Sequence, residues 1–413
     1  MPACTTRVRR PTTAVFAAAV LAVLVAVSSA PLHADDEVRA LWVVRTSLTS
    51  PASIQTMVNA AKASGFNTLL VQIRGRGDAY YQHALEPRPA ALAAQADFDP
   101  LETTIARAHA AGLQVHAWIS VNLVASAVDL PGAREHVVYR HPEWLMVPRA
   151  LVSDLADVDV HGPEFLGRLA RYVRGHKDVE GLYLSPMAPG AAEYTSSIVR
   201  DIADRYAIDG VHLDYIRYPD AEFDYSREAL TAFRRSLLND LSVADQKRYD
   251  ARMTADPLIY TEAFPERWHA FRTAKLSALV AQIAQAVKRV RPAARVSAAV
   301  MPDLAEAATS WMQNWRDWLT RDLVDVVCPM AYTTDASTFA AQVTAARAAA
   351  GSHAIWAGIG AYRLSSAQIL ENIQTARRLG ANGVILFSYD SLTEPSLGRD
   401  YLAQVGRAAF SNP

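Results

Sequence analysis

From Val38 onward, short apolar segments alternate with longer segments of helical periodicity nearly to the end of the chain. Such alternation is typical of a parallel sheet, because each crossover between parallel strands needs a connection about as long as a helix. The expected strands cover residues 38–44, 68–73, 113–120, a segment beginning at Gly210, and residues 295–300, 324–330, 354–359 and 383–389. Eight such units predict a (β/α)8 TIM barrel.

Helical periodicity is expected between these strands and after the last one. The segments are 53–64, 100–111, 192–206, 226–240, 266–290, 311–320, 338–350, 366–379 and 401–410. The region after the third strand is long and irregular, and its short apolar run at 181–185 leaves the strand count open by one. A doubly wound open sheet is the alternative fold, but no G-x-G-x-x-G or P-loop opens a helix.

The N-terminus has the pattern of a signal peptide. Arg7, Arg9 and Arg10 precede an apolar run over residues 14–27, and small residues then lead to an expected cleavage site after Ala34. The apolar run is short for a membrane span, although a retained single-helix anchor is the alternative. We therefore expect residues 1–34 to be a signal peptide of a secreted, periplasmic or extracellular protein, with no stable membrane insertion after cleavage.

The remaining segment, residues 35–413, is expected to be one domain, because no low-complexity linker interrupts residues 38–395. The expected signal peptide carries three Arg and no acidic residue, so its removal changes the formal net charge from −1 to about −4. No basic run follows, which argues against a nucleic-acid partner. Only Cys328 would remain after cleavage, so no internal disulfide is expected.

The segment from Gly210 to Pro219 contains the strongest candidate for catalysis. Side chains alternate along a strand, so Val211 and Leu213 should face the helices while His212 and Asp214 face the barrel interior. Asp214 then lies near the carboxyl end of the strand, where TIM barrels place their chemistry. A buried structural pair of Asp214 with a His or Arg is the simpler interpretation, but the Tyr and Arg residues directly after Asp214 favour a site.

Other expected strand ends also carry charged or aromatic residues. With Asp214 as the first catalytic carboxylate, the expected substrate-binding residues are Arg74, Asp78, Tyr80, His116, Trp118, His212, Tyr215, Arg217, Tyr332, Tyr389 and Asp390. Aromatic rings interleaved with carboxylates suit a sugar, because sugar ring faces stack and hydroxyls form hydrogen bonds. No metal or cofactor is expected, since the histidines lack metal-ligand spacing and no glycine-rich phosphate cradle is present.

Several stretches match one family in order along residues 38–395. They are 39–43 (RALWV), 71–81 (VQIRGRGDAYY), 116–118 (HAW), 141–145 (HPEWL), 209–219 (DGVHLDYIRYP), 359–363 (IGAYR) and 383–389 (GVILFSY). As a set they resemble the glycosyl hydrolase-like 10 family. The resemblance implies a TIM-barrel glycosidase of the bacterial envelope, and some members of that family act on peptidoglycan glycan strands stripped of their peptides.

The resemblance also carries residues over by position. Asp214 matches the family's candidate catalytic carboxylate, and Arg74, Asp78, His116 and His212 match pocket positions. Two features depart from the family pattern. Tyr215 stands where many members have a second Asp, and residues 46–49 replace an Asp-Trp-Pro after the first strand.

Glycosidases usually need two carboxylates, and the sequence leaves the partner of Asp214 open. Asp335 is the preferred candidate for the second catalytic residue, with Asp303 and Asp390 as alternatives. Substrate-assisted cleavage would need only Asp214 and an orienting partner such as His212. The expected function is cleavage of a cell-envelope polysaccharide. A carbohydrate-binding barrel without catalysis and an envelope scaffolding protein are the alternatives.

Overall fold

The computed structural model describes residues 1–3, 37–398 and 400–411 of the chain. Its parallel strands close into a barrel with the order β1-β10-β9-β8-β7-β6-β3-β2. The strands are β1 (Val38–Val43), β2 (Thr68–Arg74), β3 (Gln114–Ser120), β6 (Gly210–Asp214), β7 (Arg295–Val300), β8 (Val326–Pro329), β9 (Ala354–Ile359) and β10 (Gly383–Phe387). The predicted (β/α)8 barrel is confirmed, and its eight strands are the eight that the alternation predicts.

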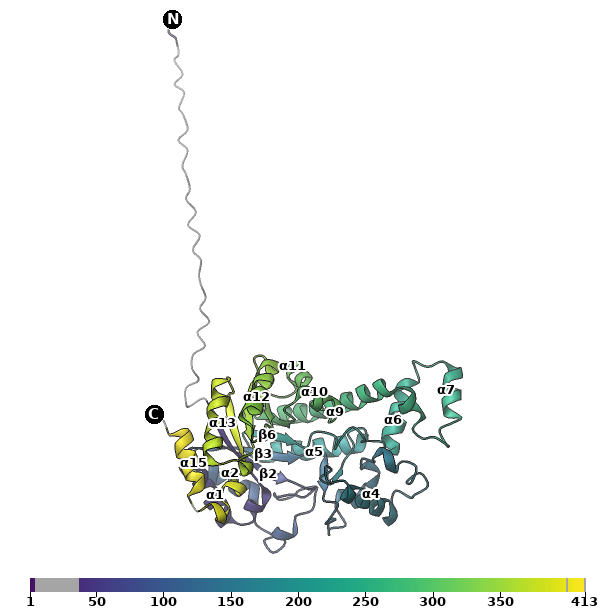
Figure 1. The fold of residues 1–413 in the computed structure, drawn as a ribbon, viewed down its shortest axis with the longest axis horizontal. Helices are drawn as coiled ribbons and strands as arrows, with labels where there is room; N and C mark the ends of the chain where they lie inside the picture. The colour runs from purple at the N-terminus through teal and green to yellow at the C-terminus, as the bar shows by residue number, and fades with distance from the viewer. Residues whose placement is uncertain (4–36, 399, 412–413) are drawn as a thin grey trace.

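Helices surround the barrel and extend to one side of it, where α9 runs toward α6 and α7 (Figure 1). The helices are α1 (Pro51–Ala63), α2 (Pro100–Ala110), α3 (Val137–Arg140), α4 (Pro163–Gly175), α5 (Pro189–Arg205), α6 (Arg227–Leu237), α7 (Val243–Asp250), α8 (Ile259–Ala263), α9 (Pro265–Val290), α10 (Leu304–Thr309), α11 (Trp315–Thr320), α12 (Ala336–Ala350), α13 (Ser366–Arg378), α14 (Tyr389–Leu392) and α15 (Tyr401–Phe410). Several begin at a side-chain cap, as α1 does at Ser50 and α13 at Ser365.

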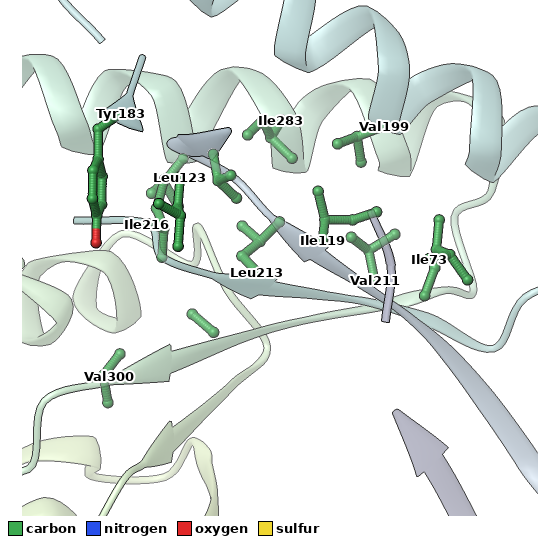
Figure 2. Packing of buried hydrophobic residues seen from close by; sticks show 14 of the residues in the cluster. Ile73, Ile119, Leu123, Tyr183, Val199, Val211, Leu213, Ile216, Ile283 and Val300 are labelled. Atoms are coloured by element: carbon green, nitrogen blue, oxygen red, sulfur yellow. The ribbon is translucent and has the colours of Figure 1, made fainter. Parts of the chain in front are cut away.

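Strand β6 shows how the alternation of side chains separates core from site. Val211 and Leu213 are fully buried and lie in the layer between the sheet and the helices that carry Val199 and Ile283 (Figure 2). His212 faces the barrel interior, where its Nε2 accepts a hydrogen bond from Trp42 Nε1 at 3.0 Å. The prediction for the two faces of this strand is therefore confirmed, and Asp214 ends the strand.

The long connection between β3 and β6 contains more structure than the sequence pattern predicts. The apolar run at 181–185 supplies β5 (Leu182–Tyr183), which pairs antiparallel with β4 (Leu123–Ala125) in a separate sheet. The barrel therefore keeps eight strands. The expectation that this whole stretch is irregular is wrong, because it contains helix α4. The apolar residues of the buried face of α4 recur at helical spacing and could have predicted the helix; they are Phe165, Leu166, Leu169, Ala170 and Val173.

The predicted signal peptide falls on residues 1–34, of which residues 4–34 lie outside the part that the structure describes. Among the described helices, none is both long enough and apolar enough to cross a lipid bilayer.

Candidate active site at the carboxyl end of the barrel

A cavity of about 440 Å³ opens at the carboxyl ends of the barrel strands, and we call it the mouth cavity. Its charged lining residues are Arg45, Arg76, Glu180, Asp214 and Arg217, and its aromatic lining residues are Trp42, Trp118, Tyr215, Tyr332, Tyr362 and Phe387. The remaining lining residues are Val44, Gln72, Ala299 and Met330. The cavity therefore combines aromatic surfaces with carboxylates and guanidinium groups, a combination that suits a sugar ligand.

Asp214 is held at the floor of the mouth cavity by two hydrogen bonds. Its Oδ2 accepts from Trp118 Nε1 at 2.9 Å, and its Oδ1 accepts from the backbone N–H of Tyr215 at 2.8 Å. Burial raises the pKa of Asp214 above its ordinary value, and the opposing effects of Arg217 and these two donors do not cancel the rise. Asp214 is therefore a carboxyl group that holds its proton more strongly than an exposed Asp does.

Glu180 is the second carboxylate of the mouth cavity, and the sequence analysis missed it. Its Oε1 accepts from Arg217 Nη2 at 3.0 Å and its Oε2 accepts from the Tyr183 hydroxyl at 2.8 Å. Burial raises the pKa of Glu180, but the charge of Arg217 and these donors outweigh it and hold the pKa below its ordinary value. Its side chain is 38% exposed, so the ionised carboxylate can reach a bound ligand.

The β4–β5 sheet brings Glu180 to the barrel mouth. Gly181 follows Glu180 directly, and a Cβ at this position would lie 2.1 Å from the carbonyl oxygen of Ala125. Only glycine fits this close approach of the two backbones. The sequence feature that could have indicated Glu180 is the glycine that follows it at the start of an apolar run. This feature predicts a close contact between two strands, but it does not predict that the contact lies at the barrel mouth.

Arg217 connects the second carboxylate to the aromatic wall. Its guanidinium lies 4.9 Å from the ring centroid of Tyr215 and 4.7 Å from that of Trp311, and it is only 7% exposed. Stacking on two rings and pairing with Glu180 fix the cation in place. Tyr215 itself has a left-handed backbone, with φ of 49°, which is uncommon for a residue other than glycine.

The aromatic side chains form one contiguous cluster around Phe387. Its ring centroid lies 6.0 Å from that of Trp42, 6.3 Å from Trp118 and 5.7 Å from Tyr332, with edge or tilted geometries. Tyr362 extends the cluster toward solvent, since 49% of it is exposed. Such rings offer flat apolar surfaces beside Asp214, as a sugar-binding cleft requires.

The two histidines predicted to contact substrate lie below the mouth cavity, and this placement corrects that prediction. His116 and His212 are fully buried. Burial lowers the pKa of His116 to about 4 and that of His212 to about 3, so both are neutral near pH 7. His212 is bonded to Trp42 and, through Nδ1, to Ser297 Oγ at 2.9 Å. It therefore does not orient Asp214 as the substrate-assisted alternative needed.

Three further predicted substrate contacts, Arg74, Asp78 and Tyr80, do not line the mouth cavity. Arg74 is fully buried, and its Nε and Nη2 donate to the two carboxylate oxygens of Glu86 at 2.7 and 2.6 Å. Asp78 accepts the backbone N–H groups of Gly75 and Arg76 and thus shapes the loop after β2. Tyr80 is 4% exposed within the core.

The strand-end aspartates predicted as partners of Asp214 cap helices or anchor a loop. Asp335, the preferred candidate, does not line the mouth cavity that contains Asp214. Asp335 accepts the backbone N–H of Thr338 at 2.7 Å as the N-cap of α12, and hydrogen bonds from Ser337 and Thr338 lower its pKa to about 2. Asp303 caps α10 in the same way. Short polar residues before a helix commonly have this role.

The aspartate after the last strand, Asp390, also binds backbone and loop groups and does not line the mouth cavity. Asp390 accepts the backbone N–H of Val44 at 2.8 Å and the hydroxyl of Ser47 at 2.7 Å. It thereby anchors the short 3₁₀ helix η1 (Arg45–Leu48), which follows β1 and contains most of the segment that departs from the family pattern. Tyr389 is 7% exposed and is the first residue of α14, with its side chain in the core. Neither side chain lines the mouth cavity.

Of the predicted site residues, the structure brings five together in the mouth cavity. They are Trp118, Asp214, Tyr215, Arg217 and Tyr332. The sequence analysis did not name Trp42 and Phe387 as site residues. The alternation of side chains along β1 and β10 could have predicted that both face inward. Over residues 37–398 and 400–411, no three His, Cys, Asp or Glu side chains lie where they could together hold a metal ion.

Comparison with known proteins agrees with this architecture. A family model described as Glycosyl hydrolase-like 10 matches residues 37–165 and 166–373. The glycosyl hydrolase YngK of Bacillus subtilis (strain 168) is 24% identical over 205 residues, which cover 45% of this chain and 34% of that protein. The chain thus matches about a third of the length of this curated relative.

Solved structures share the fold at low sequence identity. The PgaB (BpsB) glycoside hydrolase domain from Bordetella bronchiseptica is 16% identical with a TM-score of 0.62, over 90% of this chain and 99% of that one. Alpha-L-fucosidase isoenzyme 2 from Paenibacillus thiaminolyticus is 16% identical with a TM-score of 0.59, over 91% and 49% of the two chains. The likeness shows a common barrel fold. The match to the family model covers most of the chain, which therefore belongs to the glycosyl hydrolase-like 10 family.

Proposed function

We propose that the protein is an exported glycoside hydrolase that cleaves a cell-envelope polysaccharide, namely the glycan strands of peptide-free peptidoglycan. The observation that carries the proposal is a pair of carboxyl groups, Asp214 and Glu180, whose pKa values are shifted in opposite directions within one aromatic cavity. Two carboxyl groups whose environments separate their pKa values are the usual arrangement for acid and base roles.

We assign a role to each group. Asp214, with its raised pKa, donates a proton to the glycosidic oxygen as the bond from that oxygen to the anomeric carbon breaks. Glu180 stays ionised and stabilises the positive charge that develops on the sugar ring, or takes the proton of the water that adds to it. Arg217 keeps Glu180 ionised, and Trp118 orients Asp214. The aromatic cluster supports the sugar rings.

Export and the choice of glycan rest on the sequence. The basic and apolar residues of segment 1–34 support export, and the resemblance to a family with members that cleave peptide-stripped strands supports this substrate. YngK is a glycosyl hydrolase and the PgaB domain is a glycoside hydrolase domain, and both likenesses support glycoside hydrolysis in general.

The test is to incubate purified mature protein with peptide-free glycan strands and to follow their length by chromatography. Wild type should shorten the strands, and Asp214→Asn should reduce kcat about 10²–10⁴-fold, as expected for loss of a general acid. An Asn side chain has one acceptor oxygen, so it can keep one of the two hydrogen bonds from Trp118 and Tyr215, and the midpoint of thermal unfolding should fall but the protein should stay folded. Asp335→Asn is the matched control and should keep full activity, since Asp335 lies outside the mouth cavity.

A carbohydrate-binding barrel without catalysis is the second candidate function, because Tyr215 places a neutral ring directly after Asp214. Binding of the strands by wild type without shortening would favour this candidate and contradict hydrolysis. Continued shortening by Asp214→Asn would contradict the assignment of Asp214.

A further inference from the structure

The loop after β2 fixes the backbone of Arg76 from two sides. Asp78 Oδ1 accepts the N–H of Arg76 at 2.9 Å, and His136 Nε2 lies 2.8 Å from the Arg76 carbonyl oxygen, to which it donates. Gly77 completes the loop with φ of 66°, and a Cβ there would lie 2.7 Å from His136 Nε2. Glycine suits this left-handed position, and the two hydrogen bonds to the Arg76 backbone leave the loop little freedom to move Arg76 away from the mouth cavity.

The side chain of Arg76, in contrast, has no protein anion to bind. It lines the mouth cavity, and within the described ranges no carboxylate lies close enough to form an ion pair with it. Among the described residues, its guanidinium donates a 3.4 Å hydrogen bond to the carbonyl oxygen of Gly75 and lies 5.8 Å from the ring centroid of Tyr215. The Arg76 guanidinium is therefore held at the mouth cavity, and most of its five N–H donors form no hydrogen bond to the described protein groups.

Arg45 reaches the same cavity from the loop after β1. Its Nη1 donates to Gln72 Oε1 at 2.9 Å, and its Nε lies 3.8 Å from Asp78 Oδ2. The guanidinium lies close to Gly75, where a Cβ would be 2.4 Å from Nη1. One side of this cation is thus fixed by neighbours, so it is preorganised for a ligand on its other side.

The carboxylates of the mouth cavity do not neutralise these two cations. Glu180 is paired with Arg217, and Asp214 is bonded to Trp118 and to the backbone of Tyr215. A neutral sugar would leave Arg76 without a counter-charge among the described residues, and Arg45 would keep the Asp78 carboxylate, whose Oδ2 lies 3.8 Å from its Nε. A planar guanidinium fork matches a carboxylate, to which it can donate two parallel hydrogen bonds.

We propose that Arg45 and Arg76 form a subsite for a carboxylate carried by the sugar substrate. The proposal rests on the proposed function and adds to it the charge of the substrate. Two sugar-linked carboxylates have this chemistry, the lactyl ether carboxylate of a muramic acid residue and the ring carboxylate of a uronic acid. In peptidoglycan that keeps its peptides the lactyl group is an uncharged amide, so the subsite discriminates against that form.

The test compares peptide-free glycan strands with the same strands after carbodiimide activation and borohydride reduction, which convert each carboxylate to a primary alcohol. A second arm of the experiment compares polygalacturonate with its carboxyl-reduced form, as the test for a uronic acid carboxylate. Cleavage is measured with wild type, Arg76→Gln, Arg45→Gln, Arg76→Lys and the control Arg248→Gln. Arg248 lies on α7 and is 66% exposed, so its loss changes the net charge without touching the mouth cavity.

Wild type and Arg248→Gln should lose about 10–100-fold in kcat/KM when the carboxylates are reduced, as expected for loss of hydrogen bonds to a charged group. Arg76→Gln and Arg45→Gln should lose activity on the native strands and respond far less to reduction. Arg76→Lys should restore part of the discrimination, because it keeps the charge but not the fork. The arm in which wild type shows the discrimination identifies the source of the carboxylate.

Binding measurements on an Asp214→Asn background separate this proposal from the proposed function. Tighter binding of native than of reduced strands, lost in Arg76→Gln, supports the subsite even if wild type cleaves neither glycan, a result that would overturn hydrolysis alone. Equal affinity for native and reduced forms in both arms would overturn the subsite, whatever the cleavage result. Thermal unfolding confirms that each variant is folded.

Discussion

The barrel interior and the barrel mouth are built from the same strands yet have opposite electrostatic character. On β3, His116 lies in the interior and Trp118 in the mouth, and on β6 the corresponding residues are His212 and Asp214. The interior histidines are fully buried and neutral, whereas in the mouth Glu180 is partly exposed and pairs with Arg217, and Asp214 keeps a small exposed fraction of 9%. Depth along a strand, as well as the face, therefore decides whether an inward polar residue supports the barrel or serves its site.

The two ion pairs of this region show the same contrast. Arg74 and Glu86 are both fully buried and bonded through both carboxylate oxygens, so this pair has no capacity left for a ligand. Arg217 and Glu180 share one hydrogen bond, and the carboxylate is 38% exposed. A saturated pair stabilises the fold, and an unsaturated pair at a cavity is available for chemistry.

The largest effect should come from the carboxylate of the mouth pair. Glu180→Gln should lower kcat about 10²–10⁴-fold, and it should also lower the free energy of unfolding at neutral pH because Arg217 loses its paired carboxylate. Activity of wild type should fall as the pH drops through the lowered pKa of Glu180, and fall again as the pH rises through the raised pKa of Asp214. The variant should lack the acidic limb in a pH profile of kcat/KM. An unchanged profile would exclude Glu180 from the reaction.

The buried pair should instead show its effect in stability. Arg74→Met leaves Glu86 buried without a counter-charge and should lower the free energy of unfolding by about 3–5 kcal/mol in urea denaturation. The double variant Arg74→Met/Glu86→Met should lose less, since it removes both charges. If the single variant were fully stable but failed to cleave glycan, Arg74 would belong to the site and the contrast between the two pairs would be wrong.

The fold followed from the sequence because strand and helix periods leave clear apolar patterns. The inward placement of Trp118 and Asp214 followed from the two-residue period of a strand. Glu180 could not be found this way, because nothing local says which part of a long connection folds over the mouth. Asp335 was misplaced because an Asp after a strand is also an Asp before a helix, and its N-cap role has the same sequence pattern.

Acid should weaken the barrel through its interior histidines. Their folded-state pKa values, about 4 for His116 and about 3 for His212, lie below the ordinary value near 6.5. Below about pH 6.5 the unfolded chain binds protons that the folded chain does not, so the free energy of unfolding falls as the pH drops. Each histidine should contribute up to about 1.4 kcal/mol per pH unit until its folded pKa is reached.

The raised pKa of Asp214 acts in the opposite direction, since the folded state gains that proton first on acidification. His116→Leu removes one of the two histidine contributions. Urea denaturation between pH 7 and 4.5 should therefore show a shallower decline for the variant than for wild type. Equal slopes would mean that His116 is protonated in the folded state and that the interior is less dry than its burial implies.

The smallest effect on stability should come from Asp335, which belongs neither to the barrel interior nor to the mouth cavity. Asp335 accepts the N–H of Thr338 at the start of α12 and lies outside the mouth cavity. Asp335→Ala removes the cap and should lower the midpoint of thermal unfolding by ~1–3 °C at pH 7 while glycan cleavage stays unchanged. Because its folded pKa is about 2, the cap is fully charged above about pH 4 and is lost as the pH falls toward 2. The difference in midpoint between wild type and variant should therefore narrow at pH 2. Loss of cleavage without loss of stability would return Asp335 to the catalytic pair and remove Glu180 from it.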